Sequence, residues 1–466
     1  MRKIAYLLSL MALSSAFWAE MGQARDIEYR MAVLAMRHGM RHPTSAPSAM
    51  SLLTQNRQWP VWYTTQLGCL TPNAVEAARR LGEYFRALFI GESLITDVNA
   101  CPSDKTYYFR SDSYQRDWWT AQGITDGLFP NCKARIYAIN AEAYAEQTPQ
   151  EQGNLVCTSE IDPLFFPLEA GPRAPQMNAD QALQAAAGTI GSASGVNTQA
   201  LTQAYAKQIE ILQSATDCCQ PQACQNLPAG EQCTLAKLQD NLTADGSSVT
   251  LNGPVAVGGV LADTFLMAYE DGQPLEDVAF GRLTLGELRP TFALNNAAYD
   301  VIHNPLYVAQ AQESNQMNQI LLSLLQRASG ERLPNAVALP SNKFVMFMSH
   351  DDCLHGLAGL MNASWINEGF LPGQTPPGSG FIFTLVRDRK SHRHFVRVEF
   401  VAQTPDQMRH LERLTLERPP SIAPLAIPGC KSPTDMPYYC ALEQFSRLIR
   451  QSMNRKFITK VSSLRN

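Results

Sequence analysis

The chain has 466 residues, of which 45% are hydrophobic and 17% are charged. This composition excludes a disordered chain, because it supplies enough apolar material for a large core. A formal net charge of −4 argues against a nucleic-acid partner, since proteins that bind nucleic acids usually carry a basic excess. Beyond the N-terminal segment, the sequence has no fixed-period repeat and no apolar run of the roughly 20 residues that span a bilayer.

The N-terminal segment, residues 1–24, has the pattern of a secretory signal peptide. Arg2 and Lys3 precede an almost wholly apolar run at residues 4–13. Small residues, Gly22 and Ala24, then stand at the third and last positions before a plausible cleavage site. We expect cleavage after Ala24 and a periplasmic or secreted mature protein that has no membrane contact. The alternative is a buried N-terminal helix.

The eleven cysteines fit an exported protein in an oxidising compartment, and their odd number leaves at least one without an internal partner. The sequence separations suggest three local disulfides, namely Cys101 with Cys132, Cys224 with Cys233, and Cys430 with Cys440. No pair has a convincing CxxC spacing, so the cysteines do not predict a zinc site.

Strands and helices alternate at both ends of the chain. Apolar runs predict strands at residues 27–36, 106–109, 343–348, 381–386 and 395–401. Helical spacing and start signals predict helices from Thr71 to about residue 88, over 114–128 and over 353–360. A polar turn at 388–391 predicts a hairpin between the last two strands. This order predicts one α/β domain built from both ends of the chain.

The middle of the chain differs in character. Residues 140–285 are rich in Ala, Gln and Asn, with helical stretches at 198–214 and 257–269. We therefore expect a discontinuous α/β catalytic domain, residues 25–139 and 286–466, with residues 140–285 forming a mainly helical cap.

A dense polar cluster directly follows the first predicted strand. Residues 37–43 read RHGMRHP, and Arg37 and Arg41 flank His38. Arginine donates paired hydrogen bonds to phosphate or carboxylate, and ligands of open α/β sheets collect at the carboxyl ends of strands. The cluster therefore indicates an anion site. Taken alone, it also fits a solvated basic loop.

Two further polar clusters follow predicted strands. His350, Asp351 and Asp352 come after the strand at 343–348, and Arg110 and Arg116 come after the strand at 106–109. The first cluster also fits a helix cap, and the arginines of the second also fit ordinary surface cations. One parallel sheet would bring all three clusters to a common edge.

At these residues the sequence resembles the histidine acid phosphatases. The RHGxRxP motif of that family is matched by Arg37, His38, Gly39, Arg41 and Pro43, its distal His-Asp pair by His350 and Asp351, and its intervening arginine by Arg116. The resemblance runs over about residues 29–448 and is strongest to the bacterial periplasmic glucose-1-phosphatases and phytases. Stretches that carry it include residues 70–71, 120–122, 127–130, 280–282 and 375–378.

The resemblance implies a phosphoglycerate-mutase-like α/β domain with a mainly parallel central sheet and a mostly α-helical cap. It implies that His38 is the nucleophile and Asp351 the proton donor. It further implies a phosphate-binding set of Arg37, Arg41, Arg116 and His350. The substrate is then a small phosphomonoester, and neither a metal nor another cofactor is needed.

Five positions bear on the substrate pocket and on how far the family pattern applies. Asp117 stands where the family usually has Thr, and Asp352 where it has Thr or Ser. Ser45 stands where basic phytases carry Lys, which removes a contact for a highly phosphorylated inositol. Glu270 is expected to narrow the pocket mouth and repel polyanions, as in glucose-1-phosphatases, or else to face solvent. His42 is a further candidate for the pocket lining.

The expected protein is an exported acid phosphatase for sugar phosphates such as glucose 1-phosphate, with phytate as a secondary substrate. One alternative is a metal-dependent hydrolase that uses His350, Asp351, Asp352 and His355. Another is a phosphate-ester binding protein without turnover, to which Asp117 and Asp352 point.

Overall fold

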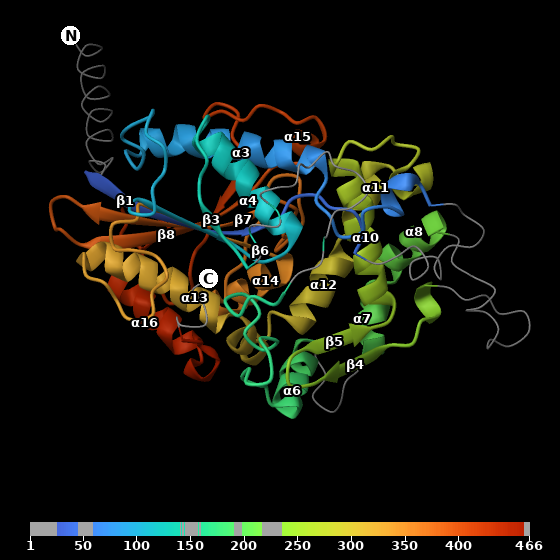
Figure 1. Cartoon of the computed structure of the whole chain (residues 1–466). Helices are drawn as coiled ribbons and strands as arrows, with labels where there is room; N and C mark the ends of the chain where they lie inside the picture. The colour runs from blue at the N-terminus through green and yellow to red at the C-terminus, as the bar shows by residue number, and fades with distance from the viewer. Residues whose placement is uncertain are drawn as a thin grey trace, which may run out of the picture.

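A central β-sheet organises the chain in the computed structural model, which describes residues 26–44, 59–139, 141, 144, 157, 160–190, 198–216 and 235–460. The eight-stranded sheet has the strand order β10-β8-β7-β1-β6-β2-β3, with β9 paired to β8. Helices cover both faces of this sheet, and a further group of helices lies beside it (Figure 1).

The sheet has a parallel centre and an antiparallel extension. Its strands are β1 (Ile27–Arg37), β2 (Tyr107–Ser111), β3 (Ile136–Tyr137), β6 (Phe344–Ser349), β7 (Gly380–Asp388), β8 (His394–Ala402), β9 (Ser421–Pro424) and β10 (Tyr439–Ala441). Strands β1, β6, β2 and β3 pair in parallel. Strand β7 pairs antiparallel with β1, and β8 pairs antiparallel with β7. The expected α/β class with a mainly parallel central sheet is confirmed, and β7 and β8 form the hairpin predicted at 388–391.

Strand β1 is buried on both faces, because its alternate side chains point to opposite helical layers. Val33 and Ala35 belong to a core shared with α13 (Leu306–Ser329), α14 (Asp351–Met361) and α16 (Leu442–Ser452). Leu34 and Met36 belong to a core shared with α3 (Pro72–Gly91) and α4 (Gln115–Leu128). This double burial explains why the strand reads as a continuous apolar run.

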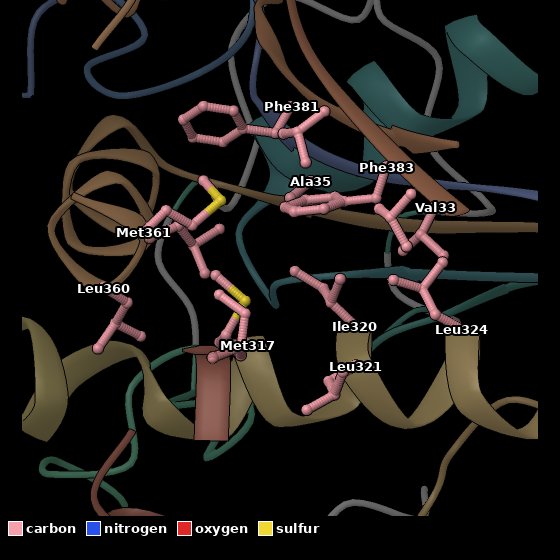
Figure 2. Packing of buried hydrophobic residues seen from close by; sticks show 14 of the residues in the cluster. Val33, Ala35, Met317, Ile320, Leu321, Leu324, Leu360, Met361, Phe381 and Phe383 are labelled. Carbon is pink, nitrogen blue, oxygen red and sulfur yellow. The ribbon is translucent and has the colours of Figure 1, made fainter. Parts of the chain in front are cut away.

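Figure 2 shows the first of these cores. Val33 and Ala35 of β1 and Phe383 of β7 lie above Ile320 and Leu324 of α13. All five side chains are almost fully buried. The packing fixes β1 over α13 and holds the carboxyl end of the strand in place.

Helices α3 and α4 approach each other closely. Thr71 caps α3 by accepting a hydrogen bond from the Ala74 amide, with Pro72 in the first turn, as the sequence predicts. A Cβ atom at Gly82 would collide with the backbone of Ile124, and one at Gly127 would collide with the backbone of α3. The glycines therefore allow the helices to touch, which sets the position of α4.

The group of helices beside the sheet has its own hydrophobic core. It contains α6 (Ala179–Thr189), α7 (Thr198–Ala204), α8 (Ala206–Thr216), α10 (Pro254–Glu270), α11 (Leu285–Thr291) and α12 (Ala293–Ile302). The sequence does not predict the small hairpin of β4 (Asn241–Ala244) and β5 (Val249–Asn252), nor the break at Tyr205 between α7 and α8. The division into a catalytic domain and a cap at residues 140 and 285 stays a prediction.

Three disulfides occur among the described residues, Cys69–Cys157, Cys101–Cys132 and Cys430–Cys440. The last two are the pairs that the sequence separations suggest, whereas the first has no local signal in the sequence. Cys353 is free and buried. The proposed pair of Cys224 and Cys233 lies outside the described residues, as do the signal peptide and Ser45.

Within the described parts of the chain, none of the helices combines the length and the apolar character that a membrane span requires.

Candidate active site

The polar clusters that follow β1 and β6 meet because these two strands are paired in register. Arg37 is the register partner of Ser349, the last residue of β6. The His38 amide donates a hydrogen bond to the Ser349 carbonyl at 2.9 Å. The rings of His38 and His350 consequently lie edge to face with their centroids 5.3 Å apart. The parallel sheet thus joins the two motifs, as predicted.

The hydrogen bond of His38 determines which ring nitrogen is available for reaction. Nδ1 lies 2.8 Å from the carbonyl oxygen of Gly39, which only accepts hydrogen bonds. We therefore assign the ring proton of the neutral histidine to Nδ1, which leaves a lone pair on Nε2. Burial lowers the pKa of His38 well below 6.5, and the positive charges of Arg116, His350, Arg37 and Arg41 lower it further. The ring is therefore neutral in mildly acidic solution.

Arg37 is fully buried and is held at three points. Its Nη1 donates to the Thr375 carbonyl at 2.6 Å. Its Nη2 lies 3.2 Å from Oδ1 of Asp263 and 3.1 Å from Oδ2 of Asp351. Although burial opposes the charged form, these two carboxylates raise the pKa of Arg37. The guanidinium is thus fixed as a cation at the carboxyl end of β1.

Asp263 is a site residue that the motif analysis does not identify. It projects from α10 in the helical group beside the sheet and pairs with Arg37 and, at 3.7 Å, with Nη2 of Arg41. The sequence does contain one signal for this residue, because Asp263 is the only acidic residue in the largely apolar stretch 254–269. A buried Asp is usually paired with another group, so its position indicates a paired carboxylate. Asp263 therefore sets the spacing of the two motif arginines.

Arg116 enters the site from the first turn of α4. Its guanidinium lies over the Tyr114 ring, 4.0 Å from the centroid, and Nη1 is 3.4 Å from the Gly68 carbonyl. Its charge is the largest electrostatic influence that lowers the pKa of His38, after burial. Arg110, in contrast, points elsewhere and forms an ion pair with Asp162. Of these two arginines, Arg110 within β2 and Arg116 in α4, only Arg116 thus joins the site.

His350 lies between two carboxylates, one from the residue that follows β2 and one from α4. Its Nε2 lies 2.8 Å from Oδ2 of Asp112 and 3.5 Å from Oδ2 of Asp117. Although burial favours the neutral ring, Asp117 and Asp112 raise the pKa of His350. Asp112, which directly follows β2, is the second site residue, after Asp263, that the motif analysis does not identify.

Asp351 and Asp352 point in different directions from the first turn of α14. Asp351 faces the arginines, and although burial opposes ionisation, Arg37 and Arg41 lower the pKa of its carboxyl group. Asp352 accepts a hydrogen bond from the Cys353 amide at 2.7 Å. It also lines a cavity of about 100 Å³ together with Phe166 and Glu313.

Glu270 does not occupy the expected position at a pocket mouth, nor does it face solvent. Its side chain is 0% exposed at the end of α10, and neither carboxyl oxygen has a hydrogen-bond partner within the described structure. Burial and the nearby Asp263 raise the pKa of Glu270 well above 4.5, so the group is protonated in acid. Repulsion of polyanions by an exposed Glu270 is therefore wrong, because the docking of α10 turns this side chain inward.

His42 lies at the edge of the site and is largely buried. Its Nδ1 is 2.6 Å from the Trp62 carbonyl, and the two rings pack with their centroids 5.2 Å apart. Burial lowers the pKa of His42. Its role in the pocket lining stays a prediction.

The metal site of the alternative hydrolase does not form. His350, Asp351, Asp352 and His355 contribute no group of three ligand atoms close enough to share an ion. His355 is buried, and burial lowers its pKa to about 3. In the described part of the chain, only Asp112, Asp117 and His350 bring three ligand atoms together, all within 4.8 Å of one another.

A neutral histidine surrounded by arginines at the edge of an α/β sheet defines a phosphatase of the histidine type. Residues 28–401 match the histidine phosphatase superfamily (branch 2), and the chain belongs to this family. A phytase of Escherichia coli (strain K12) is 27% identical over 432 residues, 92% of each chain. A glucose-1-phosphatase of Providencia rettgeri is 24% identical over 437 residues, 92% of this chain and 93% of the relative.

The fold is likewise that of known phytases. The structure of the phytase from Citrobacter braakii superimposes with a TM-score of 0.78 at 26% sequence identity. The match covers 93% of this chain and 99% of that phytase. The chain is therefore an enzyme of the histidine acid phosphatase family, similar to both phytases and glucose-1-phosphatases.

Proposed function

We propose that the protein is an exported acid phosphomonoesterase that works through a phosphohistidine on His38. The observation that carries this proposal is the hydrogen bond from Nδ1 of His38 to the Gly39 carbonyl. It directs the lone pair of Nε2 away from the backbone, in a pocket that Arg37, Arg41 and Arg116 make cationic. A neutral nucleophile in a cationic pocket is the arrangement that attack on a phosphate ester requires.

In the first step, Nε2 of His38 attacks phosphorus and forms a P–N bond while the P–O bond to the alcohol breaks. Arg37, Arg41, Arg116 and His350 hold the phosphoryl oxygens and stabilise the charge that spreads over them. The leaving alkoxide takes a proton from Asp351 and departs as the free alcohol.

The protonation of Asp351 depends on the substrate. Without substrate, Arg37 and Arg41 lower the pKa of Asp351, although burial opposes this, and the group is ionised. A phosphate dianion neutralises the same arginines and adds a nearby negative charge, which raises the pKa of Asp351 again. Binding thus prepares the proton donor, and an acidic medium favours its protonated form.

In the second step, a water molecule attacks phosphorus as Asp351 accepts one of its protons. The P–N bond to His38 breaks, inorganic phosphate leaves, and the lone pair returns to Nε2. The cycle consumes one water and restores both side chains.

The proposed substrates are sugar monophosphates such as glucose 1-phosphate, with phytate second. A cavity that contains Asp352, Glu313 and Glu169 adjoins the site through Phe166, whose ring lies 5.5 Å from that of His350. Its described lining includes carboxyl groups but no arginine or lysine. Such a lining offers hydrogen-bond partners for hydroxyl groups, and its one basic side chain is His303.

The activity is tested by hydrolysis of p-nitrophenyl phosphate at acidic pH with EDTA present. We expect turnover that the chelator does not reduce, complete loss in His38→Ala, and retention in His410→Ala, which changes an exposed histidine. Loss on chelation that a divalent ion restores would support the metal-dependent hydrolase instead. Tight phosphate-ester binding without release of phosphate would support the binding protein.

The substrate is tested with glucose 1-phosphate, phytate and an aryl phosphate at equal concentration. We expect kcat/KM for glucose 1-phosphate to exceed that for phytate. A clear preference for phytate would overturn the substrate assignment while leaving the phosphohistidine mechanism intact.

A further inference from the structure

We propose that Asp112, Asp117 and His350 form a binding site for a divalent transition-metal ion of the zinc type. This inference goes beyond phosphoester hydrolysis, because it concerns the side of His350 that is turned toward α4 and β2. The three residues come from separate parts of the chain, the loop after β2, the first turn of α4 and the residue that precedes α14.

The distances between the ligand atoms suit a small tetrahedral ion. Nε2 of His350 lies 2.8 Å from one Asp112 oxygen and 3.5 Å from one Asp117 oxygen. Bond lengths of about 2.0–2.2 Å to nitrogen and oxygen place tetrahedral ligands about 3.3 Å apart. These two separations lie within about half an ångström of that spacing. The third separation, between the two carboxylate oxygens, is at most 4.8 Å. The three residues therefore suit such an ion with water in the fourth position.

Asp117 provides an independent indication of a ligand. Its side chain is fully buried, and within the described structure neither of its oxygens accepts a hydrogen bond. A buried carboxylate is costly unless hydrogen bonds, a proton or a cation compensate its charge. His350 at 3.5 Å and Arg116 at 3.9 Å are ion-pair contacts without hydrogen-bond geometry. The site thus lacks a group that binds this carboxylate directly.

The charges of the cluster match those of a divalent ion. Two carboxylates neutralise the ion, which takes the place of any proton on Nε2 of His350 and on Asp117. An imidazole ligand favours zinc or cobalt over magnesium or calcium, which prefer sites made of oxygen alone. Coordination through Nε2 leaves the other ring nitrogen of His350 protonated. A bound ion also links β2, α4 and α14, so it stabilises the folded protein by mass action.

The proposal is tested by isothermal titration calorimetry of the metal-free, untagged mature chain with zinc chloride at pH 7 in a buffer without phosphate. We expect one zinc ion per chain and a melting temperature that rises with zinc concentration. Asp117→Asn and Asp112→Asn should each weaken zinc binding by at least about 10-fold, since loss of even an indirect supporting contact commonly has that effect. Asp126→Asn, which changes another carboxylate of α4, should bind zinc like the wild type.

The visible absorption of bound cobalt(II) distinguishes a metal ligand from a residue that only supports the fold, because the spectrum depends on the groups that coordinate the ion. We expect an intense visible absorption band of tetrahedral cobalt in the wild type and in Asp126→Asn, and its loss in Asp112→Asn and Asp117→Asn. Failure of the wild type to bind zinc, or unchanged affinity in both cluster variants, would overturn the proposal. Neither measurement depends on turnover, so a failure of the metal-site proposal can be distinguished from a failure of the proposed function.

Discussion

Arg37 and Asp351 face each other across the paired ends of β1 and β6, with Nη2 of Arg37 3.1 Å from Oδ2 of Asp351. The arginine lowers the pKa of the carboxyl group, against the opposing influence of burial. The proposed proton donor is therefore ionised while the pocket is empty. Its protonation and the binding of a phosphate dianion to Arg37 are then coupled events.

Replacement of Asp351 by Asn should slow turnover according to the leaving group. Loss of a general acid commonly costs about 10²–10⁴-fold in rate. We expect a loss of this size in kcat for glucose 1-phosphate and a much smaller loss for p-nitrophenyl phosphate, whose leaving group needs little protonation. Equal losses for both substrates would contradict the role of Asp351 as proton donor.

Asp263→Asn tests whether α10 positions the arginines. The change removes the charge that Arg37 and Arg41 share, and hydrogen bonds to charged groups contribute about 1.5–3 kcal/mol each. We expect the free energy of unfolding in urea to fall by about 2 kcal/mol and kcat/KM to fall at least about 10-fold, because small displacements of catalytic groups are costly. Asp97→Asn, at an exposed loop position, is the control. A stability loss with unchanged kcat/KM would show that Asp263 only supports the fold.

His355 should make the protein acid-sensitive independently of catalysis. Burial lowers its pKa to about 3, and neither ring nitrogen has a hydrogen-bond partner in the described structure. Below pH 6.5 the unfolded chain binds a proton at this residue that the folded protein excludes, so stability falls as the pH falls toward 3. The unfolding free energy of His355→Phe, measured relative to that of the wild type, should therefore rise by about 1.4 kcal/mol for each unit by which the pH falls over this range.

The same titration can refute this account of His355. A difference between His355→Phe and the wild type that stays constant from pH 7 to 4 would show that the folded state takes up the proton as readily as the unfolded chain. His410→Gln, at an exposed position, controls for the loss of a histidine as such.

Gly127→Ala should disturb the site from a distance. A Cβ atom at Gly127 collides with the backbone of Arg79 and Glu83, so α4 must move away from α3. We expect a loss of stability of about 1–3 kcal/mol from overpacking and a higher KM, because Arg116 moves with α4. Gly91→Ala is a matched control on α3, where a Cβ atom meets nothing within 4 Å. Loss of stability in both variants to the same extent would argue against close helix contact as the cause.

The sequence predicts the part of the site that depends on the sheet. Each motif directly follows a strand, and parallel pairing brings the strand ends together, so the proximity of His38 and His350 follows from local patterns. The apolar runs of β1 and β6 are unambiguous because both faces of these strands are buried. The same reasoning places Arg116 at the start of α4.

The contributions of α10 depend on how the helical group docks, which no local pattern specifies. The sequence predicts a helix at 257–269, yet not which of its faces meets β1. Asp263 therefore escapes a motif analysis although it contacts two arginines, and Glu270 is assigned to a pocket mouth although it is buried. In both cases tertiary packing decides what the residue contacts.

The position of β6 between β1 and β2 has a consequence for biosynthesis. Residues 344–349 are synthesised after about three quarters of the chain. Until then β1 and β2 lack the strand that lies between them and pairs with both. This strand order keeps the sheet open during most of synthesis. Truncation before residue 344 should accordingly yield a fragment in which the central sheet is not assembled.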